Sequence, residues 1–229
     1  MTRKADKPQR KKPAPPPAPE GYTARSKAQA AAMDVIARST ITFVLGPAGT
    51  GKTHLSSGYA VQKLLAGEIE NIVICRPSVA TEELGYLPGD AEAKVAPYLV
   101  PFFDALERIA GRQGTQRDLV TKAVKIAPLA YLRGRTFRRS VMILDEAQNT
   151  TYAQLKLFMT RIGAGSQVII NGDTDQSDLA LASQRLEEVA DRLKAVPGVS
   201  VFWFTEADIV RHQIIGPILR GLAKQAVGR

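Results

Sequence analysis

Short apolar runs alternate with longer stretches of helical composition along most of this chain. The runs are almost free of charged side chains and occupy residues 40–45, 71–75, 141–145, 166–172 and 199–204. Nearly unbroken apolar runs are typical of strands in a parallel sheet that is covered on both faces. The helical stretches occupy residues 23–39, 52–66, 91–110, 152–162 and 183–194. This alternation predicts an α/β domain of three layers around a mostly parallel sheet, with ligand sites at the carboxyl ends of the strands.

The first 20 residues differ in composition from the rest. They contain six Lys or Arg residues, two acids and six prolines, and beyond Met1 no aliphatic side chain larger than Ala. Such a segment cannot bury enough apolar area to order itself, so we predict a disordered basic tail at 1–21 and one domain at 22–229. The tail is either an electrostatic arm for nucleic acid or a solubilising extension. A turn-rich stretch at 76–90 is too long for a simple connection and is a candidate functional loop.

Composition narrows the class of protein further. Hydrophobic residues make up 45% of the chain, which is sufficient for a packed core, and the net charge is +9. No apolar stretch approaches the roughly 20 residues of a membrane span, and the basic N-terminus lacks the apolar segment of a secretory signal. Cys75 is the only cysteine, which excludes an intrachain disulfide and suits a reducing compartment. We expect a cytoplasmic protein without membrane association, in which Cys75 is a buried small hydrophobic residue.

The octet GPAGTGKT at residues 46–53 follows a predicted strand and opens a predicted helix. It matches the phosphate-binding pattern G-x-x-x-x-G-K-[ST] at every fixed position. Its glycines would let backbone N–H groups surround phosphate oxygens, Lys52 would reach the β- and γ-phosphates, and Thr53 would offer its hydroxyl to Mg²⁺. We therefore predict that ATP and Mg²⁺ bind here. The predicted nucleotide contacts are Gly46, Pro47, Ala48, Gly49, Thr50, Gly51, Lys52 and Thr53.

Two acids follow the buried run VMIL. Asp145 at the end of this strand would hold Mg²⁺, directly or through water. Glu146 would polarise a water molecule for attack on the γ-phosphate, which favours hydrolysis over a small-molecule kinase, because a kinase has no use for such a water. The alternative is an acid pair that caps the next helix.

Glutamine residues supply two further candidates. In IINGDTDQS an apolar run ends in Gly172 and Asp173, and Gln176 would sense the γ-phosphate or the attacking water, although Gly-Asp alone is also a simple turn. The G-D-x-x-Q pattern resembles the third motif of superfamily-one helicases. In those helicases a glutamine upstream of the phosphate loop reads the adenine edge, a role that would fall to Gln29. The alternative for Gln29 is a surface position on a helix.

Residues 119–144 contain no acid. The basic residues there are Lys122, Lys125, Arg133, Arg135, Arg138 and Arg139. With Tyr131 and Phe137 between them, they would offer phosphate contacts and base stacking to a nucleic acid, or they form a solvated basic face. Arg161 and Arg211 are later isolated cations, and either is a candidate arginine finger that stabilises charge on the transferring phosphate.

Taken together, several segments resemble the PhoH-like ATPases. They are GPAGTGKT, RPSVATEELGYLPGD, YLRGRTF, ILDEAQNTT, TRIGAGSQVIINGDTDQSDL and DIVRH, in the order of the family and spanning roughly residues 22–215. The resemblance implies a single RecA-like P-loop NTPase domain related to superfamily-one helicases. Members of the family are proposed to act on RNA, and some of them are fused to a PIN-type ribonuclease module. Lys52, Thr53, Asp145, Glu146 and Gln176 match the hydrolysis positions of the family. The segment DLALASQRLEEVADRL departs from the proline and short turn that the family usually has there.

A helicase closes two RecA-like domains on ATP, whereas this chain has room for one. We therefore expect a homo-oligomer, most simply a hexameric ring, in which a neighbour supplies Arg161, Arg211 or Arg133 in trans. Two classes of function follow. One is an ATPase that remodels single-stranded RNA or DNA. The other is a nucleotide-dependent switch that regulates a partner nuclease and hydrolyses ATP slowly.

Overall fold

The computed structural model describes residues 23–77, 103–104, 107, 115–173 and 185–210. The predicted tail and nearly all of the predicted helix at 91–110 lie outside these ranges. So do Gln176 and Arg211, two of the candidate functional residues.

A six-stranded sheet forms the middle of the domain, and every pair of neighbouring strands in it is parallel. Its strands are β1 (Ile41–Leu45), β2 (Asn71–Cys75), β3 (Val124–Ile126), β4 (Ser140–Leu144), β5 (Gln167–Gly172) and β6 (Val199–Trp203). The five predicted strands are confirmed to within one residue at each end. The sequence patterns missed β3, because an edge strand of three residues with a central lysine forms no apolar run.

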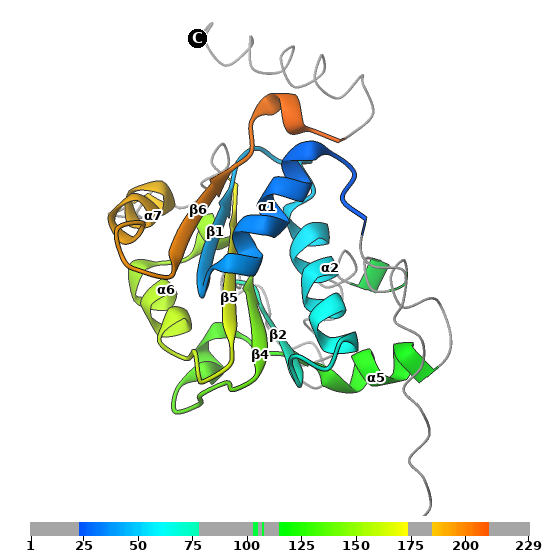
Figure 1. Ribbon diagram of the computed structural model, residues 1–229. Coiled ribbons are helices and arrows are strands. Elements are labelled where there is room, and N and C mark those ends of the chain that lie inside the picture. Colours follow the sequence, from blue (N-terminus) through cyan, green and yellow to red (C-terminus); the bar gives the residue numbers. More distant parts are fainter. Residues whose placement is uncertain (1–22, 78–102, 105–106, 108–114, 174–184, 211–229) are drawn as a thin grey trace, which may run out of the picture.

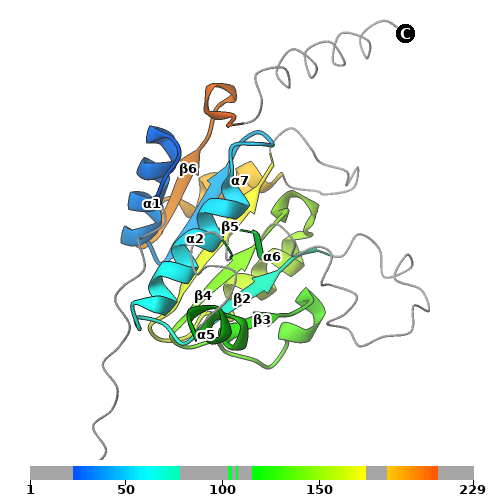
Figure 2. The same cartoon turned by 90° about the vertical axis from the view of Figure 1, so that its right-hand side faces the viewer.

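Helices cover both faces of this sheet, which confirms the three-layer α/β fold. The helices are α1 (Lys27–Arg38), α2 (Lys52–Leu65), α5 (Thr115–Ala123), α6 (Tyr152–Met159) and α7 (Leu186–Leu193), with short 3₁₀ helices η2 (Leu129–Leu132), η3 (Ala147–Asn149) and η4 (Glu206–Asp208). Figure 1 shows α1 and α2 on one side of the sheet and α6 and α7 on the other, and Figure 2 turns the α1, α2 and α5 face to the viewer.

Two hydrophobic cores result, one on each face. Val44, Ile143 and Ile169 point to the side of α1, α2 and α5. Their strand neighbours Leu45 and Leu144 join the core under η2, α6 and α7. Successive strand residues are therefore buried on opposite faces, which is why the strands read as continuous apolar runs.

The helix predicted at 152–162 is three residues too long, since α6 ends at Met159. Thr151 begins it with a capping box, accepting from the Gln154 N–H while the Gln154 side chain accepts from the Thr151 N–H. After the helix, the Arg161 carbonyl accepts a hydrogen bond from the Phe137 N–H and Ile162 pairs with Phe137. This tertiary pairing takes residues 160–162 out of the helix.

The strand order, β3-β2-β4-β5-β1-β6, decides which loops meet. Because all strands are parallel, the segments that follow β2, β4, β5 and β1 leave from the same edge of the sheet, side by side. They carry Arg76, Asp145, Asp173 and the octet 46–53 respectively. No helix in the described ranges is long and apolar enough to cross a membrane.

Candidate nucleotide-binding site

The octet 46–53 forms a tight loop between β1 and α2. Gly46, Gly49 and Gly51 have φ angles of 139°, 89° and 85°, which other residues rarely adopt. A β-carbon on Gly46 would lie 2.5 Å from the Phe204 carbonyl oxygen, and one on Gly51 would lie 2.7 Å from the Gln29 amide nitrogen. Backbone conformation therefore favours glycine at all three positions, and close packing adds to this at Gly46 and Gly51, as a phosphate loop demands.

Lys52, the first residue of α2, folds back over the loop that precedes it. Its ammonium group donates to the Gly46 carbonyl at 2.6 Å and to the Pro47 carbonyl at 2.9 Å. The positive charge is thus held beside the backbone that would surround the phosphates. This is the position from which a lysine reaches the β- and γ-phosphates of a nucleotide.

Thr53 and Asp145 come together at the start of α2. The Thr53 hydroxyl donates to the Asp145 carboxylate at 2.9 Å, and the Asn171 amide donates to the same oxygen at 3.2 Å. Ser56 in turn donates to the Asn171 side-chain oxygen at 2.8 Å. Burial raises the pKa of Asp145, and the nearby charge of Arg76 opposes that shift. The structure therefore brings the two predicted Mg²⁺ ligands together, with Asn171 as support from β5.

Glu146 is held at both of its carboxylate oxygens. One accepts from the Arg76 guanidinium at 2.7 Å and the other from the Gln148 amide at 2.7 Å. Its backbone is left-handed, with φ 56° and ψ 40°, and its side chain makes no capping hydrogen bond to η3. Glu146 therefore occupies the N-cap position of η3, but its side chain does not cap this helix. Burial raises the pKa of Glu146, but the hydrogen bonds from Gln148 and Arg76, together with the positive charges of Arg76 and Lys52, bring the pKa below its usual value.

Gln148 links this carboxylate to the end of β5. While its amide nitrogen donates to Glu146, its amide oxygen accepts from the Asp173 N–H at 2.9 Å. Gly172 leaves room for Leu186, whose side chain lies 2.3 Å from where a β-carbon would stand. The end of β5 is therefore in contact with the residues after β4, which is where a sensor of bound phosphate is expected to start.

Gln29 is 1% exposed, so its interpretation as a surface residue is wrong. Its amide nitrogen donates to the Thr50 carbonyl at 3.0 Å, and its amide oxygen accepts from the Arg25 N–H at 2.9 Å. The side chain thus joins α1 to the phosphate loop. Its role as an adenine reader stays a prediction.

Arg161 lies far from the loop in its own chain. It follows α6 next to Phe137, where β4 and β5 begin, whereas the phosphate loop lies where the strands end. Its guanidinium donates to the Arg135 carbonyl and to the Thr160 hydroxyl. The chain therefore does not bring Arg161 to its own phosphate site.

The basic stretch at 119–144 separates into exposed and buried parts. Arg133, Arg135 and Arg138 are exposed, and Tyr131 is 63% exposed. Phe137 is buried in the core on the α6 side, so its proposed use for base stacking is wrong. The Phe137 ring instead packs in the hydrophobic core, a tertiary contact that composition alone does not predict.

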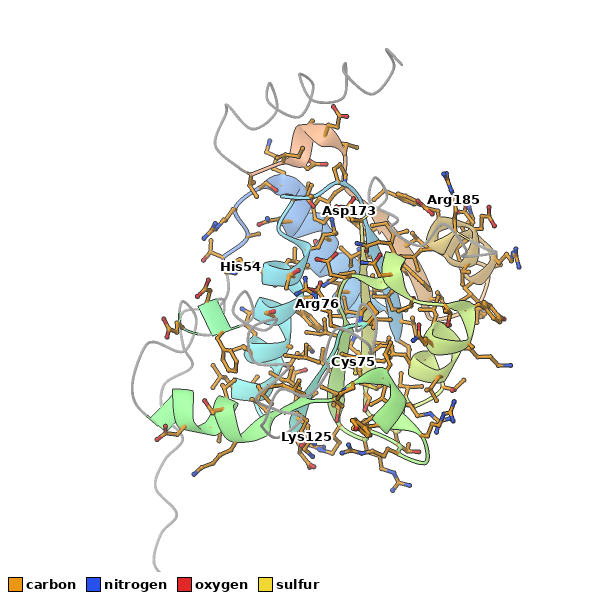
Figure 3. All side chains as sticks on the ribbon, turned by 180° about the vertical axis from the view of Figure 1, so that it is seen from behind. His54, Cys75, Arg76, Lys125, Asp173 and Arg185 are labelled. Atoms are coloured by element: carbon orange, nitrogen blue, oxygen red, sulfur yellow. The ribbon has the colours of Figure 1, made fainter. Side chains whose placement is uncertain are left out.

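The predictions from sequence missed three side chains at this site, Arg76, Gln148 and Asn171. Arg76 begins the candidate loop at 76–90, and Figure 3 shows it between Cys75 and Asp173. Each of the three lies at or just beyond the end of an apolar strand, as Asp145 does. That shared placement is the signal that would have found them.

A family model described as PhoH-like protein matches residues 22–222. The PhoH-like protein of Bacillus subtilis (strain 168) is 46% identical over 190 residues, which cover 82% of this chain and 60% of the relative. Protein PhoH of Escherichia coli (strain K12) is 41% identical over 195 residues, covering 83% of this chain and 55% of that protein. The chain therefore spans little more than half the length of these relatives.

Among solved structures, the chain is similar to the Sulfolobus solfataricus SWI2/SNF2 ATPase core in complex with dsDNA. The identity is 12% and the TM-score 0.48, over 84% of this chain and 47% of that one.

Proposed function

The chain belongs to the PhoH-like protein family, and on that premise we propose that it binds ATP with Mg²⁺ and hydrolyses it. One observation carries the proposal: the hydroxyl of Thr53, on a complete phosphate loop, lies 2.9 Å from the carboxylate of Asp145. A phosphate loop joined to a strand-end carboxylate is the pair of parts that P-loop NTPases use to hold a nucleotide and its metal. Glu146 follows directly, which adds a base for water.

The side chains suit Mg²⁺, which takes oxygen ligands and is usually held by one or two protein groups together with substrate phosphates. Thr53 and Asp145 would hold the ion, directly or through water, and it would neutralise charge on the phosphates. Within the described ranges, no three His, Cys, Asp or Glu residues gather as a metal site of their own. A metal that shares its coordination with the nucleotide fits this set of donors.

In the proposed reaction, the phosphate loop and Lys52 bind the triphosphate, and Glu146 orients a water molecule in line with the γ-phosphorus. Glu146 takes a proton as the water oxygen attacks. The new P–O bond forms while the bond from the γ-phosphorus to the β,γ-bridging oxygen breaks, and ADP leaves with that electron pair. The proposal also includes two roles taken from the family resemblance. Gln176 would sense the γ-phosphate, and Gln29 would read the adenine.

We further propose that hydrolysis is coupled to single-stranded RNA or DNA. Arg133, Arg135 and Arg138, together with Tyr131, are exposed and would contact phosphates and stack on a base. The second candidate is a switch that binds ATP, hydrolyses it slowly and regulates a partner nuclease. Its support is that the described residues form one α/β domain around a single six-stranded sheet.

Steady-state hydrolysis of MgATP, with and without single-stranded RNA or DNA, tests the function. We expect turnover that falls by roughly 100-fold or more in Glu146→Gln, because a general base contributes about 10² to 10⁴ in rate. Binding of a fluorescent ATP analogue should persist in this variant. The matched control is Glu188→Gln on the exposed side of α7, which should hydrolyse ATP normally.

Stimulation of turnover by a single strand supports coupling to nucleic acid. Slow turnover that no nucleic acid changes supports the switch. Unchanged turnover in Glu146→Gln contradicts the hydrolytic mechanism, because no other base has been assigned to the site.

A further inference from the structure

Arg76 is the first residue after β2, and its position relative to the two acids is set by the sheet. Cys75 pairs with Leu144 across β2 and β4, and the Asp145 N–H donates to the Cys75 carbonyl at 2.9 Å, which extends the ladder past the strand. The backbones of Arg76 and Asp145 are therefore held next to one another. The Arg76 guanidinium therefore reaches both carboxylates from the residue that directly follows β2.

The guanidinium of Arg76 lies between the two acids. One nitrogen is 2.7 Å from Glu146 Oε1 and 3.9 Å from Asp145 Oδ2. The Asp145 side chain is 10% exposed, the Arg76 side chain 25% and the Glu146 side chain 36%. Partial burial weakens solvent screening, so two adjacent carboxylates would repel one another strongly without a cation between them.

Glu146 is fixed from two directions. Arg76 donates to one carboxylate oxygen and Gln148 to the other, and the backbone at Glu146 is left-handed. A base that must accept a proton from one water molecule works only from a narrow range of positions. The contact with Arg76 supplies that restraint, whereas Gln148 alone would leave the carboxylate free to rotate about a single hydrogen bond.

We propose that Arg76 is a positioning residue for ATP hydrolysis, which orients the Glu146 carboxylate toward the attacking water and offsets the repulsion between Glu146 and Asp145. This inference rests on the proposed function, and it assigns Arg76 a role at the same site. Arg76 acts through Glu146 rather than on the nucleotide. Its loss should therefore affect turnover more than binding.

The test compares Arg76→Ala and Arg76→Lys with the wild type and with Arg38→Ala, a matched control at the exposed end of α1. Turnover of MgATP and the Kd for a fluorescent ATP analogue are measured for each. We expect kcat to fall roughly 10- to 100-fold in Arg76→Ala. This loss is smaller than the full contribution of a general base, because Glu146 is still present in the variant. The Kd should change less than about threefold. Arg76→Lys should regain part of kcat, because an ammonium restores the charge but not the planar fork.

A double-mutant comparison separates positioning from a general structural effect. In single turnovers, Glu146→Gln and the double variant Glu146→Gln/Arg76→Ala should have the same residual rate within about twofold, because residues that act as a unit are not additive. The proposal would be overturned if Arg76→Ala lowered the rate of the Glu146→Gln variant by as large a factor as it lowers the rate of the wild type. If Arg76→Ala fails to fold, Arg76→Lys decides, and a normal kcat in that variant overturns the proposal.

Two further results would also overturn it. One is a Kd raised tenfold or more with an unchanged kcat, which would make Arg76 a nucleotide-binding residue. The other is an unchanged kcat in Arg76→Ala while Glu146→Gln is inactive, which leaves the proposed function standing and removes only this inference. If instead the wild type does not hydrolyse ATP, the proposed function fails, and the inference fails with it.

Discussion

Asp145 and Glu146 are neighbours in sequence but have different surroundings. Asp145 faces Thr53 and Asn171 in the buried centre of the site, whereas the left-handed backbone at Glu146 directs its side chain toward Arg76 and Gln148. Non-glycine residues in this conformation are uncommon and occur often at functional sites. The left-handed backbone at Glu146 accompanies the different surroundings of the proposed metal ligand, Asp145, and the proposed base, Glu146.

Cys75 lies one residue before Arg76 and has the opposite character. It is 1% exposed, and burial raises its pKa to about 12, with the charge of Arg135 opposing. We expect the thiol to stay protonated and unreactive up to pH 9, since the thiolate is the reactive form. Labelling with iodoacetamide at pH 9 should be slow in the folded protein and fast in urea. Equal rates in both conditions would contradict the buried position.

At the scale of elements, the order of the strands assembles the site. Because β5 lies between β1 and β4, its end brings Asn171 and Asp173 between the phosphate loop and Asp145. One residue, Gln148, connects the end of β5 to Glu146, so it would carry a change at the proposed sensor to the proposed base. This arrangement favours a site in which sensing of the γ-phosphate and activation of water are linked by direct contact.

The start of α6 offers a test of how helix capping contributes to stability. Thr151 and Gln154 form a capping box, so Thr151→Ala should lower the free energy of unfolding by about 1 kcal/mol. For a domain of this size, that corresponds to a fall in Tm of roughly 2–4 °C. Calorimetry of this variant is compared with Thr136→Ala, an exposed threonine that caps no helix. A loss of the same size in both variants would contradict the capping role.

At the scale of the whole molecule, Arg161 and the phosphate loop lie at opposite ends of the sheet. An arginine in this place can stabilise the transferring phosphate only from a neighbouring subunit, as in a head-to-tail ring. We expect light scattering in the presence of MgATP to give a mass about six times the 24.8 kDa of one chain. A monomer with and without ATP would contradict the ring.

Mixing of variants tests the same arrangement in function. Arg161→Ala subunits keep an intact site, and Glu146→Gln subunits keep Arg161, so a mixture should regain turnover that neither shows alone. The control mixture replaces Arg161→Ala with Lys52→Ala, which leaves no subunit with a working site. If the first mixture regains no ATP turnover, Arg161 is not the arginine finger. The same test would then be applied to Arg211 and Arg133.

The sequence by itself determined the parts of this protein whose signal is contiguous. Five of six strands were predicted, since a strand buried on both faces is apolar at every position. The phosphate loop was evident for a similar reason: the glycines, Lys52 and Thr53 act within one turn of chain. Asp145 and Glu146 were also predicted, because an acid directly after a buried strand stands out against its surroundings.

Only the tertiary structure decided which distant residues meet. Arg76 is 70 positions from Glu146 in the chain, and their contact depends on the pairing of β2 with β4. The burial of Phe137 and Gln29 and the placement of Arg161 away from its own site depend on packing in the same way. A side chain's type and its immediate neighbours predict what chemistry it offers. Its partners follow from strand order and packing, which involve residues far apart in sequence.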